Sequence, residues 1–215
     1  MYRSAAYPRV EWDAIMRFIA ENFQGKCVGV NSEGYPESSV LPYEFHGPTK
    51  DAPLGWFDLH LVQADPTFVA LQQHAPCAFI IDQPLAFSPH YLVDPDYAGY
   101  ATLHFRAAHF YCRATTSTNV ESVASVLDNL VRSYEPGTPF HPVTDHAFYK
   151  DDLARLGIAH LVITAWDAKF KMAQNRSPEE QARLKAFLKN RGQALDKLAV
   201  EELQREWERL HSGDS

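Results

Sequence analysis

A short polar segment, Ala168 to Glu180, holds the residue types and spacing of this sequence that are best suited to chemistry. It reads AKFKMAQNRSPEE and follows an apolar run, Ile158 to Ala165, that is typical of a strand. Ser177 followed by Glu180 is a capping-box pattern, which predicts that a helix begins at Ser177. A junction of strand and helix gathers backbone N–H groups and cations, and it suits a phosphate or a carboxylate. The alternative, which composition alone favours, is a solvated connector with scattered charge.

Length, charge and cysteine content limit the classes of protein to consider. The chain has 215 residues, 20 Lys and Arg against 27 Asp and Glu, and a net charge of −7. This balance argues against sequence-independent DNA binding, which needs a basic face. The three cysteines form no CxxC pair and are expected to be buried free thiols in a reducing cytoplasm. We expect no signal peptide and no membrane-spanning segment, because no apolar run is long enough to cross a membrane, and none of the common nucleotide, zinc-protease or hydrolase motifs is present.

The elements that must position the polar segment are helices mixed with several consecutive strands. Asp65 is predicted to cap a helix whose first position is Pro66, and Gly34 suits a hairpin turn. Consecutive strands favour a small, mostly antiparallel barrel with helices outside it, an α+β class with a mainly β core. The other predicted helices are 9–23, 119–134, 145–155, 178–190 and 193–210, and the predicted strands are 27–30, 38–45, 56–62, 77–82, 101–114 and 158–165.

Five segments together resemble one known family. The chain opens with MYRSAAYPRV, and 41–43 read Leu-Pro-Tyr. Residues 60–66 read His-Leu-Val-Gln-Ala-Asp-Pro, 88–91 read Ser-Pro-His-Tyr, and 169–177 read KFKMAQNRS, which is the most specific match. In this order they resemble the PaiB-type FMN-binding negative transcriptional regulators, a branch of the flavin-binding split-barrel superfamily.

The resemblance implies an FMN-binding split β-barrel with peripheral helices and a helical C-terminus. It also implies a homodimer that holds its cofactor in a groove between the subunits. We therefore expect a split-barrel domain over 1–190 and a helical extension over 191–215. The flavin phosphate and ring contacts carried over residue by residue are Ser88, Thr102, Lys171, Gln174, Asn175 and Arg176.

The sequence departs from the family pattern in the segments that line the cofactor region. Residues 101–105 read Ala-Thr-Leu-His-Phe, so that Leu103 replaces a tryptophan and His104 an asparagine. His90 stands where the family has a serine. His104 could hydrogen-bond a cofactor edge, or it could be a barrel histidine covered by a helix. His90 and His104 join the cofactor-binding candidates, and these departures put the identity of the cofactor in doubt.

His60 opens a second possibility for the cofactor. It shares a strand face with Asp58, and a carboxylate that orients an imidazole is the usual partner of a metal-bound histidine. Relatives of the PaiB type include the haem-binding piperazate synthases, in which a histidine from this segment holds the iron. The resemblance therefore allows haem b, with His60 as its axial ligand, in place of FMN.

Three functions follow, each in the cytoplasm and none at a membrane. The first is an FMN-binding protein with oxidoreductase-type activity on a small-molecule substrate. The second is a haem-dependent enzyme of the same fold that forms an N–N bond. The third is a negative transcriptional regulator, and the net charge makes direct DNA contact by this chain the least favoured of the three.

Overall fold

The computed structural model describes residues 1, 7–144 and 147–211. Seven strands form one sheet in the order β2-β1-β5-β6-β7-β4-β3, and the pairings with β1 and β4 are antiparallel. The strands are β1 (Gln24–Val30), β2 (Pro36–Pro42), β3 (Glu44–His46), β4 (Trp56–Val62), β5 (Pro76–Ser88), β6 (Thr102–Ser117) and β7 (Leu156–Lys171). The helices are α1 (Trp12–Ala20), α2 (Pro66–Gln73), α3 (Val120–Tyr134), α4 (Lys150–Leu153), α5 (Pro178–Arg191) and α6 (Asp196–His211), with short 3-10 helices η1 (His90–Leu92) and η2 (Ala98–Tyr100).

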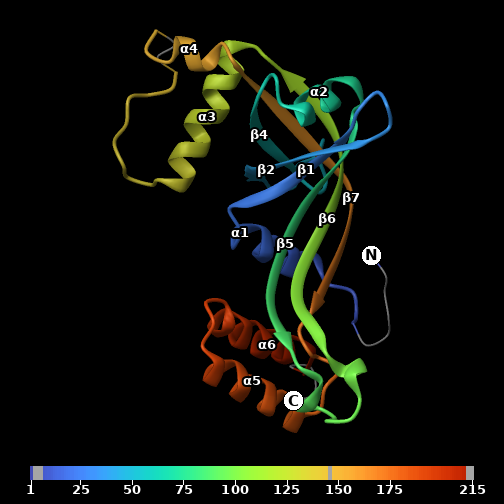
Figure 1. Ribbon diagram of the computed structural model, residues 1–215. Helices are drawn as coiled ribbons and strands as arrows, with labels where there is room; N and C mark the ends of the chain where they lie inside the picture. The colour runs from blue at the N-terminus through green and yellow to red at the C-terminus, as the bar shows by residue number, and fades with distance from the viewer. Residues whose placement is uncertain (2–6, 145–146, 212–215) are drawn as a thin grey trace. The chain divides into compact units, whose positions relative to one another are not determined.

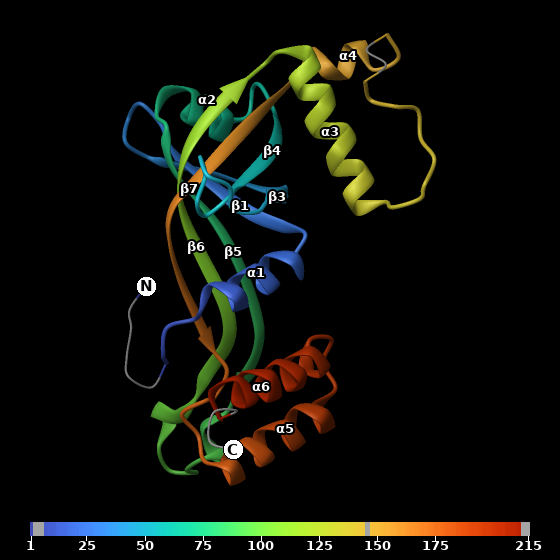
Figure 2. The same cartoon turned by 180° about the vertical axis from the view of Figure 1, so that it is seen from behind.

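The described chain forms two compact units. Unit 1 comprises 1–15, 82–108 and 168–215, and unit 2 comprises 16–81 and 109–167. The three long strands β5, β6 and β7 contribute residues to both units (Figures 1 and 2).

Unit 2 is a closed sheet with an aromatic interior. Only Tyr43 separates β2 from β3, so one continuous segment pairs with β1 through its first half and with β4 through its second half. This double pairing closes the sheet into a barrel. Phe57, Phe79 and Phe110 are fully buried, and the Phe57 ring lies 4.6 Å from that of Phe79 and 5.1 Å from that of Phe110. Trp56, Asp58 and His60 alternate with the buried residues of β4 and so lie on its other face.

Unit 1 joins the ends of the long strands to a pair of helices. Ser177 caps α5 with the predicted box, since its side chain accepts from the backbone N–H of Glu180 and the Glu180 side chain accepts from the backbone N–H of Ser177. Gly192 ends the helix in the left-handed conformation with φ 65°. Both views show α6 beside α5 (Figures 1 and 2). Leu184 of α5 and Leu203 of α6 are buried.

The α+β class with a mainly β core is confirmed, and so are the capped starts of α2 and α5. The predicted strand 158–165 was too short, because β7 continues to Lys171. Ala168 and Phe170 are buried while Lys169 and Lys171 are half-buried, an alternation that keeps two lysines within a strand. Residues 145–146 of the predicted helix 145–155 lie outside the described residues, and α4 forms only at Lys150–Leu153.

No helix among the described residues has both the length and the apolar character to cross a membrane.

Candidate functional site

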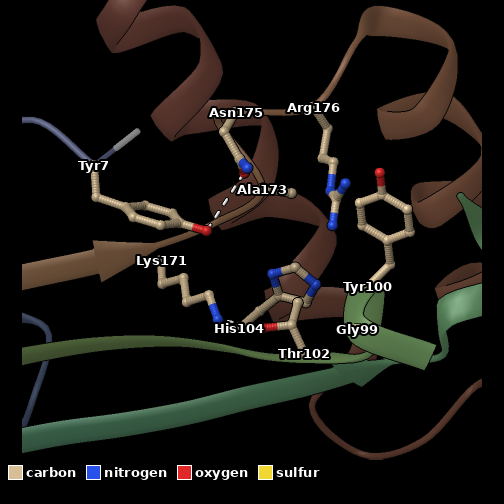
Figure 3. A pocket seen from close by; sticks show the side chains of 9 residues that line it. All are labelled: Tyr7, Gly99, Tyr100, Thr102, His104, Lys171, Ala173, Asn175 and Arg176. Carbon is tan, nitrogen blue, oxygen red and sulfur yellow. Dashed lines mark hydrogen bonds between the residues drawn. The ribbon is translucent and has the colours of Figure 1, made fainter. Parts of the chain in front are cut away.

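A polar pocket of about 270 Å³ lies in unit 1 where β7 leads into α5 (Figure 3). The pocket takes side chains from the ends of β6 and β7, from η2 and from the segment before α1. We call it the cationic pocket, and its lining residues are Tyr7, Gly99, Tyr100, Thr102, His104, Lys171, Ala173, Asn175 and Arg176.

The backbone at the corner after β7 is held in a strained conformation. Ala173 is buried with φ 56°, in the left-handed region that side chains other than glycine seldom adopt. Its carbonyl accepts from the N–H of Arg176 at 2.9 Å and from the Gln181 amide at 3.0 Å. These bonds offset the strain and direct Asn175 and Arg176 to the pocket.

Two cations face the pocket. The Lys171 amino group donates to the Thr102 hydroxyl. Burial is the main cause that lowers the pKa of Lys171, and the charges of Lys169 and Arg176 lower that pKa further. The Arg176 guanidinium lies 4.8 Å from the centre of the Tyr100 ring. The Glu180 carboxylate lies 4.0 Å from Arg176, and Glu180 belongs to the α5 capping box rather than to the pocket lining.

His104 adds an uncharged ring to the floor of the pocket. It is only 2% exposed, and its Nε2 lies 3.0 Å from the hydroxyl of Ser88. Burial lowers the pKa of His104 to about 4, with Lys171 and Arg176 adding to the effect and the Lys171 backbone opposing it. The imidazole is therefore neutral at pH 7 and contributes hydrogen bonding without charge.

Tyr7 forms the opposite wall from Tyr100 (Figure 3). Its hydroxyl donates to the Asn175 side-chain oxygen at 3.4 Å. The Lys169 amino group lies 5.0 Å from the centre of the Tyr7 ring, and that of Lys171 lies 6.0 Å from it. None of the nine described lining residues carries a carboxylate. Two cations, hydroxyls and an amide without a balancing acid suit a phosphate or a similar anion.

His60 lies in unit 2, on the outer face of β4. Its Nδ1 is buried without a hydrogen-bond partner among the described residues, and burial lowers its pKa. The predicted partner of His60, Asp58, instead contacts two other histidines. His160 Nδ1 lies 2.7 Å and His46 Nε2 lies 2.9 Å from the Asp58 carboxylate, which also accepts from the Trp56 indole at 3.1 Å. Within the described ranges, no three acidic, histidine or cysteine side chains gather so as to hold a metal ion.

The nine predicted site residues fall into three groups in the structure. Five line the cationic pocket, namely Thr102, His104, Lys171, Asn175 and Arg176. Two lie beside it, since Ser88 contacts His104 and Gln174 is buried within the corner. His90 lies on η1 with its Nε2 3.2 Å from the Pro95 carbonyl, and His60 lies in unit 2.

Sequence reasoning missed the two aromatic walls, Tyr7 and Tyr100. Tyr100 precedes Thr102 and His104 at a spacing of two, and that alternation could have placed it on the same face. Tyr7 comes from the N-terminal segment, and no local sequence pattern predicts its contact with the pocket.

A protein-family model described as "Putative FMN-binding domain" matches residues 1–164. The chain belongs to this FMN-binding domain family. FMN is accordingly the cofactor that the family assigns to it, and the donors of the cationic pocket fit a phosphate-bearing group. No curated protein matches the sequence.

Solved structures show the same fold. A FAD- and haem-binding protein from Mycobacterium smegmatis superposes with a TM-score of 0.56 at 14% identity, over 77% of this chain and 73% of that chain. The flavocytochrome Anf3 from Azotobacter vinelandii gives 0.53 at 17% identity, over 80% of this chain and 78% of that chain. At these identities the likeness establishes the split-barrel fold.

Proposed function

We propose that this member of the FMN-binding domain family binds FMN with the phosphate in the cationic pocket of unit 1, and that it carries out an oxidoreductase-type reaction on a small molecule. The observation that supports the proposal is the pairing of Lys171 with Arg176 in a pocket whose described lining has no carboxylate. Such a surplus of partly buried positive charge is costly, and an anionic ligand relieves the cost.

Each side chain has a distinct part in holding the anion. Lys171 and Arg176 neutralise its charge, and the planar guanidinium also fixes direction. Thr102 and Asn175 supply a hydroxyl and an amide that orient the oxygens. His104, kept neutral by burial and held by Ser88, adds a hydrogen bond without charge. When bound, the flavin supplies the redox chemistry, and the protein supplies position and electrostatics.

The volume of the pocket limits how much of FMN it can enclose, and its two cations favour the phosphate end. A volume of about 270 Å³ is below that of pockets that enclose a whole drug-sized ligand, roughly 300 Å³ and above. We therefore assign the phosphate and part of the ribityl chain to the pocket, with the flavin ring outside it. A homodimer that holds the ring between subunits remains our proposal, as implied by the family resemblance.

Comparing FMN with riboflavin tests the phosphate assignment, because the two differ only in the phosphate. Binding is followed by the quenching of flavin fluorescence on titration with the protein. We expect the affinity for FMN to be about 100-fold higher than that for riboflavin. The Lys171→Met/Arg176→Met variant should lose most of that difference in affinity. Lys189→Met, which removes an exposed lysine of α5, is the matched control and should leave the ratio unchanged. Equal affinities for the two flavins in the unmodified protein would contradict the placement of the phosphate in the cationic pocket.

A haem-dependent enzyme is the second candidate, supported by the buried and unpaired Nδ1 of His60. Burial favours the neutral imidazole, which is the form that binds a metal. The visible spectrum of the purified protein separates the two cofactors, since flavin absorbs near ~450 nm and haem has an intense band near ~400 nm. A His60→Ala variant with undiminished haem content would rule out axial ligation by this residue.

The finer membership in the PaiB-type branch, and with it a role as a repressor, stays a prediction. The net charge of −7 argues against direct operator binding, and a gel-shift assay that showed tight, sequence-specific binding would overturn that view. The boundary at residue 190 and the location in the cytoplasm also stay predictions.

A further inference from the structure

We infer that Glu206 of the C-terminal helix α6 is a positioning residue for the cationic pocket, and that it acts through Gln174. The inference deepens the proposed function and rests on it. It assigns to α6 a role in ligand binding beyond the packing of a helical extension.

Gln174 holds the backbone on both sides of Lys171. Its Nε2 donates to the Phe170 carbonyl at 2.6 Å, and its Oε1 accepts from the Met172 N–H at 2.7 Å. Phe170 and Met172 flank Lys171 in the chain. The buried Gln174 side chain therefore fixes the backbone at the end of β7, from which Lys171 reaches the pocket. Asn175 and Arg176 follow Gln174 directly and share the same anchored corner.

Glu206 reinforces the orientation of the Gln174 amide that the Met172 N–H and the Phe170 carbonyl already require. It is 5% exposed, and its Oε1 lies 3.4 Å from the Gln174 Nε2. A carboxylate only accepts hydrogen bonds, so it favours the orientation in which the amide NH₂ faces α6 and Phe170 while the amide oxygen faces Met172. With an apolar residue at 206 the Phe170 carbonyl and the Met172 N–H would still orient the amide, but the corner would lose its hydrogen bond to α6.

The charge of Glu206 is balanced within the same helix. The guanidinium of Arg209 lies 2.6 Å from Glu206 Oε1, so the buried acid has a cationic partner on its own helix. Replacing this pair with apolar side chains would serve packing equally well, because buried ion pairs seldom add net stability. The hydrogen bond to Gln174 is therefore a role of this buried acid that an apolar side chain could not fill.

Glu202 provides a matched control one helical turn away. It is 3% exposed and lies on the same helix, but its carboxylate pairs with Arg106 of β6 at 2.8 Å and with Arg205 at 2.9 Å. Removing either acid breaks a buried ion pair of α6. Of the two acids, Glu206 is the one with a hydrogen bond from Gln174 of the corner.

The experiment compares Glu206→Leu, Glu202→Leu and Glu206→Gln in the full chain. For each variant we would measure the affinity for FMN and for inorganic phosphate, the free energy of unfolding, and the hydrogen-exchange rate of the Met172 amide. We expect Glu206→Leu to weaken both ligands about tenfold and to speed exchange at Met172, and Glu202→Leu to change affinity by less than about twofold although it also loses stability. Glu206→Gln keeps an acceptor oxygen and should recover most of the affinity.

A double-variant cycle tests whether Glu206 acts through Gln174. Gln174→Leu/Glu206→Leu should weaken FMN no more than Gln174→Leu alone, because the second change then has nothing left to orient. Additive losses, or equal losses in the Glu202→Leu and Glu206→Leu variants, would overturn the inference. If the unmodified protein bound neither ligand, the proposed function would fail. The positioning role would still be supported if hydrogen exchange at Met172 were faster in Glu206→Leu but not in Glu202→Leu.

Discussion

Trp56, Asp58, His46 and His160 form a second polar group, in unit 2, which we call the Asp58 cluster. It is partly buried like the cationic pocket of unit 1, but the two differ in the partners of their charged groups. In the pocket, Lys171 and Arg176 face a space whose described lining has no carboxylate. In the cluster, the Asp58 carboxylate has His160 at 2.7 Å and the Trp56 indole at 3.1 Å. The Asp58 carboxylate already has hydrogen-bonding partners, whereas no carboxylate lies among the described residues that line the pocket.

We interpret this difference as that between a proposed ligand site and a group that stabilises its own fold. A polar cluster whose groups hydrogen-bond one another contributes to stability and has few groups left to bind a ligand. Two cations close together and a strained backbone at Ala173 lower stability, and functional sites commonly carry that cost. Three substitutions test the contrast.

Asp58→Ala should have the largest effect, and it should be an effect on stability alone. The change leaves the His160 and Trp56 donors without their acceptor, and we expect the free energy of unfolding in denaturant to fall by about 3 kcal/mol. Asp58→Asn keeps an acceptor oxygen and should lose clearly less. FMN affinity should be unchanged in both variants, and a parallel loss of affinity would break the distinction between the two regions.

Protonation of His104 should contribute to the loss of stability at acid pH. Its pKa is about 4 in the folded protein against 6.5 for an exposed imidazole, so the unfolded chain takes up the proton first as the pH falls. The stability that depends on neutral His104 is complete above about pH 6.5 and lost on acidification, by about 2 kcal/mol at about pH 5. Urea unfolding at a series of pH values would show a flatter acid limb in His104→Gln, and an identical limb would contradict the assignment.

Lys171→Met should have the smallest effect on stability, with the opposite sign from Asp58→Ala. Because burial lowers the pKa of Lys171, the folded protein holds the charged lysine at a cost that is present at neutral pH and disappears above about pH 10.5. The variant should be as stable as the unmodified protein or slightly more stable at pH 7, while its FMN affinity falls. A destabilised variant would show that Lys171 belongs to the structure of the corner rather than to a ligand site.

Local sequence signals predicted the class of fold well. The Asp65 and Ser177 caps, the turn at Gly34 and the amphipathic helix α3 depend on contacts within a few residues, and each formed as predicted. The extent of the long strands was underestimated, because their ends contain polar residues such as Lys169 that only the pairing within the sheet keeps extended.

The site was predictable only where one segment carried it. Lys171, Asn175 and Arg176 come from a single motif, and all three line the pocket. Tyr7 and the anchoring by Glu206 depend on segments distant in the chain that meet only in the fold. The pairing of Asp58 with His160 instead of His60 depends on the register of β4 against β7, which places Asp58 opposite His160.

Calorimetric titration with inorganic phosphate is the most direct test of the cationic pocket as an anion site. The unmodified protein and a His46→Ala/His160→Ala variant should both bind phosphate with one site per chain, and Lys171→Met/Arg176→Met should not. Binding that survives the loss of Lys171 and Arg176, or that vanishes with the two histidines of the Asp58 cluster, would contradict the assignment.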